Sequence, residues 1–207
     1  MTIRKGQQWG SMAVPPSDLT TVSSNSELRA AVQAARVSNT MLPVIALLGG
    51  DLMRTIGGTA DATRLRSGDL VPHLPIDVVR VRVDDSREGW FVAHLVARRS
   101  WWRGRIVAAM NAQFISSWDV APRAHPNDGL VDVVNVSAEM GLQQRWMARS
   151  RIRLGTHVPH PLITIDPRAS MTIDLTRSTA LWLDGERWGS GRHLQLDVEP
   201  DAFVVCV

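Results

Sequence analysis

A tight polar turn runs directly into a string of valines near the middle of this 207-residue chain. Pro126, Asn127, Asp128 and Gly129 form the turn, because Asn and Asp bond to nearby backbone and Gly adopts positive φ without steric cost. The residues that follow, 130–136, read LVDVVNV and are mostly β-branched. A strand of this kind is typical of a sheet covered on both faces, so a layered, β-rich fold is expected.

More strands are expected on either side of this turn. Apolar alternation or short apolar runs predict strands at 78–83, 90–97, 106–115, 162–165, 171–175, 180–183, 193–198 and 202–207. Their close spacing is typical of a sandwich.

One helix is expected within this half, starting near Ser137 and ending before Gly155. Its apolar side would carry Met140, Leu142, Trp146 and Met147. The arginines of the same segment are expected on the solvated side of the helix and at its exit; they are Arg145, Arg149, Arg151 and Arg153.

The first part of the chain predicts a small α/β arrangement. Ser24 with Glu27 three residues later is a capping-box pattern, and it predicts a helix at 26–37. A buried strand at 43–48 follows, and then a short helix at 52–56 capped by Asp51.

Composition narrows the classes of function. The formal net charge is only +3, and the chain lacks the dense basic stripe with stacking aromatics of a nucleic-acid-binding domain. No apolar run approaches the roughly 20 residues needed to cross a bilayer. The single cysteine, Cys206, excludes an intrachain disulfide framework, and the first residues lack a secretory signal. A cytoplasmic protein with no nucleic-acid partner is expected.

Three blocks of sequence, in this order, resemble motifs of the diacylglycerol kinase-like lipid kinases, a family that shares its fold with the NAD kinases. The first, at 47–57, reads LLGGDLMRTIG, and the second joins the Ala-Pro-Arg-Ala turn at 121–124 to 128–134. The third is Asp-Gly-Glu at 184–186. The second block departs from the family pattern at Asn127, where an aspartate is usual.

The resemblance implies an α+β, mainly β fold, with a lipid-kinase-type C-terminal β-sandwich domain and a small N-terminal α/β remnant. The implied division is an irregular arm at 1–21, a remnant α/β segment at 22–74 and a β-rich, sandwich-like domain at 75–207. The family's glycine-rich ATP signature should lie at 22–27, where this chain reads VSSNSE. A divergent member that lacks most of the nucleotide-binding domain is therefore expected.

The resemblance also implies roles for individual residues. Glu186 would be the general base that takes the proton from a lipid hydroxyl, with Asp184 beside it as a second catalytic candidate. The candidates for phosphate or nucleotide binding are Gly49, Gly50, Asp51 and Arg54. Asp128 and Asp132 are candidate metal ligands, and Mg²⁺ and ATP are expected cofactors only if the protein is an active kinase.

The residues themselves also allow plainer interpretations. Gly49-Gly50-Asp51 is ordinary turn chemistry at the end of a strand, and Asp184-Gly185-Glu186 has the form of a turn between two strands. Asp128 and Asp132 would then be solvent-facing aspartates. His157 and His160 have a spacing that zinc sites use, but with no cysteine nearby a loop is favoured.

Residues 98–105, RRSWWRGR, mix cations with tryptophans. This pattern suits a membrane surface or an acidic lipid head group, unless the tryptophans fold back on the core. Three functions stay open: binding of a lipid or other small ligand without phosphoryl transfer, an active lipid kinase with an unusual or partner-completed nucleotide site, and a non-catalytic regulatory subunit. Peripheral membrane contact and a homodimer are candidate associations.

Overall fold

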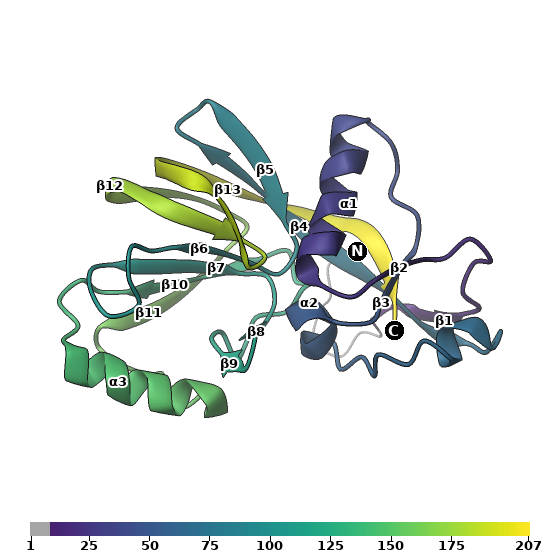
Figure 1. Cartoon of the computed structure of the whole chain (residues 1–207), viewed down its shortest axis with the longest axis horizontal. Coiled ribbons are helices and arrows are strands. Elements are labelled where there is room, and N and C mark those ends of the chain that lie inside the picture. Colours follow the sequence, from purple (N-terminus) through teal and green to yellow (C-terminus); the bar gives the residue numbers. More distant parts are fainter. Residues whose placement is uncertain (1–8) are drawn as a thin grey trace.

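A computed structural model describes residues 9–207, and strands make up most of its regular structure (Figure 1). Its helices are α1 (Asn25–Val37), α2 (Gly50–Thr55) and α3 (Leu142–Arg151), with two short 3-10 turns, η1 (Arg64–Arg66) and η2 (Ile152–Leu154). None of the helices within residues 9–207 has the length and apolar character of a membrane span.

Most of the strands join one twisted sheet, in the order β1-β4-β13-β12-β6-β7-β10-β11, with β5 beside β4 and with β3 and β2 added in parallel beside β13. The early strands are β1 (Ser11–Ala13), β2 (Thr20–Val22), β3 (Ile45–Leu47), β4 (Val71–Val83), β5 (Arg87–Phe91) and β6 (His94–Ala97). The later ones are β7 (Ile106–Met110), β10 (Val131–Val136), β11 (Ile163–Arg168), β12 (Ser170–Leu183) and β13 (Glu186–Cys206), and β8 (Phe114–Ile115) and β9 (Trp118–Asp119) form a separate hairpin.

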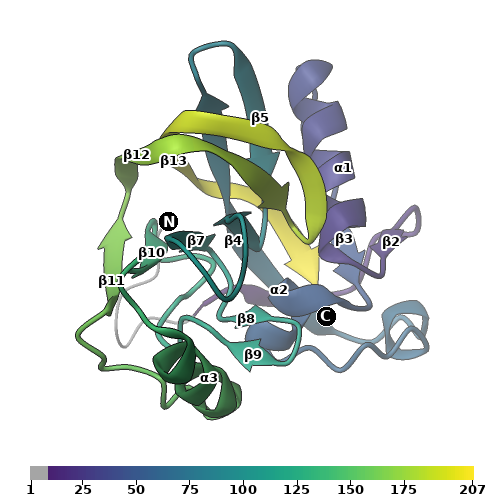
Figure 2. The ribbon, with the colours of Figure 1, turned by 60° about the vertical axis from the view of Figure 1, so that its left-hand side comes forward.

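The sheet folds over so that β4, β5, β12 and β13 face β6, β7 and β10 across a buried core (Figures 1 and 2). Valine, leucine and phenylalanine side chains fill this space, among them Val79, Val81, Phe91, Leu95, Val107, Val133, Leu181 and Leu194. The sandwich predicted from the spacing of the strands is therefore confirmed.

The valine strand is buried on both faces, as predicted. Val131 and Val133 of β10 belong to the interior of the sandwich, whereas Val134 packs on the opposite face, in the layer that α3 covers. β7 is also buried on both faces, since Val107 packs in the interior of the sandwich and Ile106 packs in the layer under α3. Because both faces are covered, these strands read as continuous apolar runs.

A second core lies under α1. Leu28 and Val32 of this helix pack against Leu47 of β3, Leu52 of α2 and Val205 of β13. The predicted start of α1 is confirmed, since the Ser24 hydroxyl accepts a hydrogen bond from the Glu27 N–H at 3.2 Å. The small α/β part therefore sits at the end of the sheet formed by β4, β13 and β3.

The predicted cap of the second helix is wrong. α2 begins at Gly50, so Asp51 lies in its first turn. The Leu52 N–H instead donates to the side-chain oxygen of Asn25 in α1, at 3.2 Å. This capping contact crosses 27 residues of sequence, and a local pattern could not reveal it.

The predicted orientation of α3 is also wrong. The helix begins at Leu142, and Leu142 and Trp146 are 55% and 64% exposed, whereas Arg145 is only 5% exposed. Arg145 turns inward because four backbone carbonyls behind the helix accept hydrogen bonds from its guanidinium group.

The predicted strand boundaries need four corrections. The strand expected at 106–115 ends as β7 at Met110, and Phe114–Ile115 pairs with β9 instead. The strand expected at 90–97 is interrupted at Val92 and Ala93, whose N–H groups bind a side chain instead of a neighbouring strand. The last four expected strands merge into β12 and β13, each continuous through an irregularity in its pairing. Short strands β1 and β2 lie within the segment expected to be irregular, of which residues 1–8 lie outside the described part.

Candidate functional site

Three of the acidic residues predicted from sequence lie in one network at the junction of α1, α2, β6 and the β12–β13 turn. They are Asp51, Asp184 and Glu186, which are far apart in sequence. His94 and Arg29 join them. Sequence reasoning did not predict these two joining residues.

Asp51 is held from three sides. One carboxylate oxygen lies 3.0 Å from both the Asn25 amide nitrogen and His94 Nε2, and the other accepts the Ser116 N–H at 2.7 Å. The contacts come from α1, β6 and the β8–β9 hairpin. Asp51 therefore ties these elements together.

Asp184 lies deepest in the network, and its side chain has no exposed surface. Its two oxygens accept the backbone N–H groups of Val92, Ala93 and His94 at 2.8 to 3.0 Å. Burial raises the pKa of Asp184, and His94 and these three hydrogen bonds oppose the rise. The three amides belong to the break between β5 and β6, where no strand partner is available, so Asp184 acts as that partner.

Glu186 lies at the surface of the same network, 60% exposed, with an oxygen 2.5 Å from the Arg29 guanidinium. Arg29 is one helical turn after Asn25 on α1, so the two side chains share a face of that helix. Its Nε is 3.9 Å from Asp184. Arg29 thus spans the two carboxylates of the Asp-Gly-Glu turn.

The turn itself is confirmed as a two-residue hairpin. Asp184 and Gly185 join β12 to β13 with φ values of +51° and +89°. Positive φ at both central residues is the pattern of a type I′ turn, which Asp-Gly favours.

The glycines of the first block pack against α1. A Cβ atom on Gly49 would overlap the Ser23 carbonyl, and one on Gly50 would overlap the Asn25 side chain. Arg54 stacks on Phe114 at 4.1 Å and donates to the Ser116 carbonyl at 2.6 Å. The space that these glycines leave free is therefore filled by this chain's own backbone and side chains.

The polar turn of the second block is anchored on Asp77, a fully buried residue of β4. Asp77 accepts the N–H groups of Gly129 and Asp201, both at 2.8 Å. The Asn127 amide donates to the Asp77 and Asp201 carboxylates at 3.3 and 3.0 Å. An aspartate at 127 would place a third negative charge there, which accounts for the asparagine.

Asp128 and Asp132 line a groove of about 970 Å³ together with Arg123, His160 and a run of prolines. Burial raises the pKa of both carboxyls, that of Asp128 to about 6, and the charges of Asp132 and Asp77 add to the effect on Asp128. Within residues 9–207, no group of three or more His, Cys, Asp or Glu side chains could hold a metal ion. Metal binding by this pair stays a prediction.

Replacement of Asp128 by Asn should stabilise the protein above pH 6. The folded-state pKa of about 6 lies above the ordinary aspartate pKa of 3.8, so the wild type loses stability as the pH rises through this interval. The gain should be on the order of 1 kcal/mol, because solvent screens the partly exposed carboxyl of Asp128. Urea unfolding at pH 4 and pH 8 measures it, and an equal effect at both pH values would contradict the prediction.

The same variant tests the metal hypothesis. If Asp128 and Asp132 bind Mg²⁺ or Ca²⁺, the cation should raise the melting temperature of the wild type and leave Asp128→Asn unchanged. Equal shifts in the two proteins would show that the pair is not the site.

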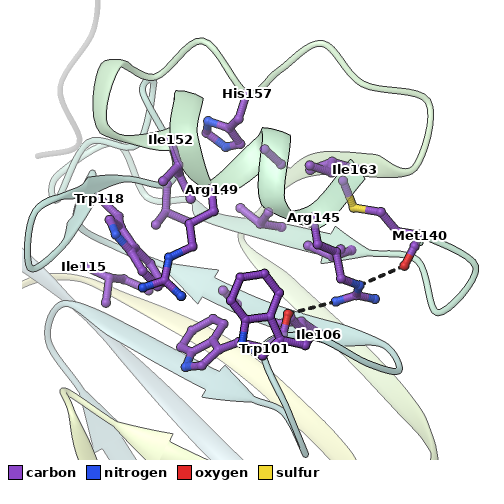
Figure 3. A pocket seen from close by; sticks show the side chains of 16 residues that line it. Trp101, Ile106, Ile115, Trp118, Met140, Arg145, Arg149, Ile152, His157 and Ile163 are labelled. Atoms are coloured by element: carbon purple, nitrogen blue, oxygen red, sulfur yellow. Dashed lines mark hydrogen bonds between the residues drawn. The ribbon is translucent and has the colours of Figure 1, made fainter. Parts of the chain in front are cut away.

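A separate apolar pocket of about 100 Å³ lies between α3 and the outer face of β7 and β10 (Figure 3). Its floor consists of the outward side chains of the strands, and tryptophans from the 98–105 segment and the β8–β9 hairpin form its wall. Its lining includes Trp101, Trp118, Met140, Ala148, Arg149 and Ile163.

Arginines hold the tryptophans in place. Trp101 and Trp118 meet edge to face at 5.3 Å, and Arg98 lies 4.2 Å from the ring centres of both Trp101 and Trp182. Arg149 lies 5.3 Å from the ring centres of Trp102 and Trp118. The expectation that the tryptophans fold back on the core thus holds for Trp101, whereas Trp102 remains 38% exposed.

His157 is buried in the wall of this pocket, 5% exposed, and neither ring nitrogen has a well-aligned hydrogen-bond partner. Burial lowers the pKa of His157, which favours the neutral ring. The side chain therefore adds little charge to an otherwise apolar lining.

The chain belongs to the family of the YegS C-terminal NAD kinase beta sandwich-like domain, which matches residues 70–207. A structure described as a diacylglycerol kinase from Bacillus anthracis str. Sterne is similar, with a TM-score of 0.64 and 13% identity over 91% of this chain and 75% of that chain. A second structure from that organism, provisionally named a diacylglycerol kinase, gives a TM-score of 0.67 and 13% identity over 91% and 77%. A comparison with curated proteins finds no match.

These findings confirm the family resemblance and the mainly β fold expected from it. At 13% identity the likeness to the two solved structures concerns the fold alone. The roles of Asp51, Asp184 and Glu186 in phosphoryl transfer stay predictions.

Weak signals for the unpredicted residues were present in the sequence. Asn25 and Arg29 are spaced by four on a predicted helix, so they share a face. His94 and Asp77 are polar residues within apolar strands, a placement that requires a buried partner.

Proposed function

We propose that this chain binds the acyl part of a lipid in the pocket under α3 and does not itself transfer a phosphoryl group. The observation that carries the proposal is the apolar pocket walled by Trp101 and Trp118. An apolar cavity of roughly 150 Å³ in a protein core stays dry and takes up a benzene-sized ligand. A pocket of about 100 Å³ suits a smaller apolar group, such as the end of an acyl chain.

The position of the pocket supports a ligand that also has a polar end. Arg149 is exposed and stacks on two of the lining tryptophans, Trp102 and Trp118, so it lies where the pocket meets solvent. A carboxylate or phosphate on the ligand would be attracted to its guanidinium group.

The state of the acidic network supports the absence of phosphoryl transfer by this chain. Catalysis of that reaction depends on a phosphate cradle and on neutralisation of developing charge. Asp184 uses both oxygens on backbone amides, and the Glu186 carboxylate pairs with Arg29. A Cβ atom on Gly49 or Gly50 would meet Ser23 or Asn25, so these glycines make room for the chain itself, which supports the absence of a phosphate cradle in this block.

One observation favours a second candidate, an active lipid kinase completed by a partner chain. Asp51, Asp184 and Glu186 come from separate blocks, and the fold nevertheless gathers them around His94 and Arg29. Glu186 is the most exposed of the three candidates and could serve as a base if a substrate displaced Arg29.

Filling the pocket should weaken the binding of an apolar ligand. Ala148 of α3 lines the pocket, and Ala148→Leu adds volume there. We expect the variant to bind a fluorescent short-chain fatty acid about tenfold more weakly, with an unchanged melting temperature. Ala138→Leu is the matched control, because Ala138 is exposed outside this pocket. Equal affinity in all three proteins would overturn the binding proposal.

Phosphoryl transfer needs its own assay. Wild-type protein incubated with labelled ATP, Mg²⁺ and diacylglycerol should give no labelled lipid. Labelled product that disappears in Glu186→Gln would instead establish the kinase.

A further inference from the structure

The outward flank of α3 exposes large apolar side chains that no described part of the chain covers. Leu142 is 55% exposed, Trp146 64% and Leu154, just after the helix, 78%. Single exposed apolar residues are common, but several gathered on one element indicate an interaction surface.

Helical spacing places two of these side chains beside a cation. Leu142, Trp146 and Arg149 are separated by four and three residues and therefore lie along one flank of α3. Arg149 stacks on Trp102, which is 38% exposed, so the surface continues onto the 98–105 segment. We call these four residues, with the exposed arginines around them, the α3 surface. α3 is the outermost element at this end of the molecule (Figure 1).

The charge of the α3 surface has one sign. Every charged residue in the segments 98–105 and 142–153 is an arginine. Arg98 and Arg145 are held below the surface against tryptophan rings or backbone carbonyls, whereas Arg105 and Arg149 make contacts of these kinds and stay exposed. The exposed ones are Arg99, Arg103, Arg105, Arg149, Arg151 and Arg153, and within the described part of the chain none forms an ion pair with a carboxylate.

We propose that the α3 surface docks on the surface of a bilayer that contains anionic phospholipids. Leu142, Trp146 and Trp102 would enter the interfacial region, and the arginines around them would meet lipid phosphates. A nucleic-acid backbone would satisfy the arginines but leave Leu142 and Trp146 in water. The combination of exposed apolar side chains with unpaired arginines therefore favours a membrane over a phosphate polymer.

Docking of the α3 surface on a membrane is a function additional to the proposed binding of an acyl chain, and it does not require that binding. It would, however, bring Trp102 and Arg149, which also line the pocket, to the bilayer surface. The pocket would then open at the level of the lipid head groups.

Sedimentation with vesicles tests the proposal. We expect at least about a hundredfold tighter binding to vesicles of phosphatidylcholine with phosphatidylglycerol than to phosphatidylcholine alone, with the difference lost at high salt. The double variant Leu142→Ser/Trp146→Ser should bind the anionic vesicles about tenfold more weakly. Because both side chains are exposed, the fold should survive these changes, and the melting temperature checks that it does.

Charge variants test whether vesicle binding depends on the arginines of the α3 surface or only on the net charge of the protein. Arg151→Gln/Arg153→Gln should weaken vesicle binding about thirtyfold, since each basic residue near an anionic surface contributes about 1 kcal/mol and two residues are removed. Arg64→Gln/Arg66→Gln removes the same charge at η1 and should bind like the wild type. Arg66 lines a groove with Leu19 and Thr21 near β2, which lies at the opposite end of the molecule from α3 (Figure 1).

Three results would overturn the proposal: equal binding to neutral and anionic vesicles, equal losses in the two charge variants, or a dimer in solution that Leu142→Ser/Trp146→Ser dissociates. The last result would assign the surface to a second copy of the chain. Ala148→Leu keeps the acyl proposal separate, because it should lose the soluble fatty acid and still bind vesicles.

Discussion

Asp184→Ala should lower the free energy of unfolding by about 3–5 kcal/mol, a large part of the total stability of a domain of this size. The side chain is fully buried and accepts three backbone N–H groups. Without it, the amides of Val92, Ala93 and His94 lose their partner at a place where the sheet offers none. Alanine also tolerates the positive φ of this position poorly.

Two further variants show how much of this loss of stability comes from the Asp184 carboxylate and how much from the rest of the turn. Asp184→Asn tolerates the positive φ and keeps one acceptor oxygen, so it should lose about half as much stability. Glu186→Gln, one residue beyond the turn, should change the free energy of unfolding by less than about 1 kcal/mol, because the Glu186 side chain is largely exposed and solvent screens its charge. Urea unfolding of the three variants provides the comparison. A small effect of Asp184→Ala together with loss of an enzymatic activity would instead assign Asp184 to catalysis.

The features that could be predicted from sequence are those that short segments determine. The Ser24 cap with α1, the valines of β10 and the Asp184-Gly185 turn each follow from a few neighbouring residues, and the structure confirms all three. The three family blocks also predicted the sandwich, because their order in the chain is specific to a family with that fold.

The features that could not be predicted depend on partners far away in sequence. Asp51 was expected to cap its own helix, but the cap comes from Asn25 and the carboxylate faces His94. A periodic pattern shows which side chains share a face, but it does not show which face is buried. For α3 the apolar side was therefore assigned to the core, when the core takes Arg145.

Arg145→Met should detach α3 from the sandwich while the rest of the fold persists. The guanidinium donates to the carbonyls of Met140, Trp101, Gly104 and Ser137 over 2.5 to 3.3 Å. Methionine fills a similar volume without donors, so four carbonyls lose their partner at a cost of about 3–5 kcal/mol. These carbonyls lie either in the residues just before α3 or in the 98–105 segment. The loss of stability should therefore be confined to this region.

Amide hydrogen exchange resolved along the chain measures this effect. The N–H groups of α3 should exchange at least about a hundredfold faster in Arg145→Met, whereas those of β4 and β13 should change little. Arg151→Met is the matched control, because it makes the same chemical change at an exposed position of the same helix and should leave α3 protected. Arg145→Lys should lie between them, since a single ammonium cannot reach all four carbonyls. Uniformly faster exchange throughout the sandwich in Arg145→Met would show that α3 is part of one cooperative unit, and the apolar pocket beneath it could then not open without unfolding the protein.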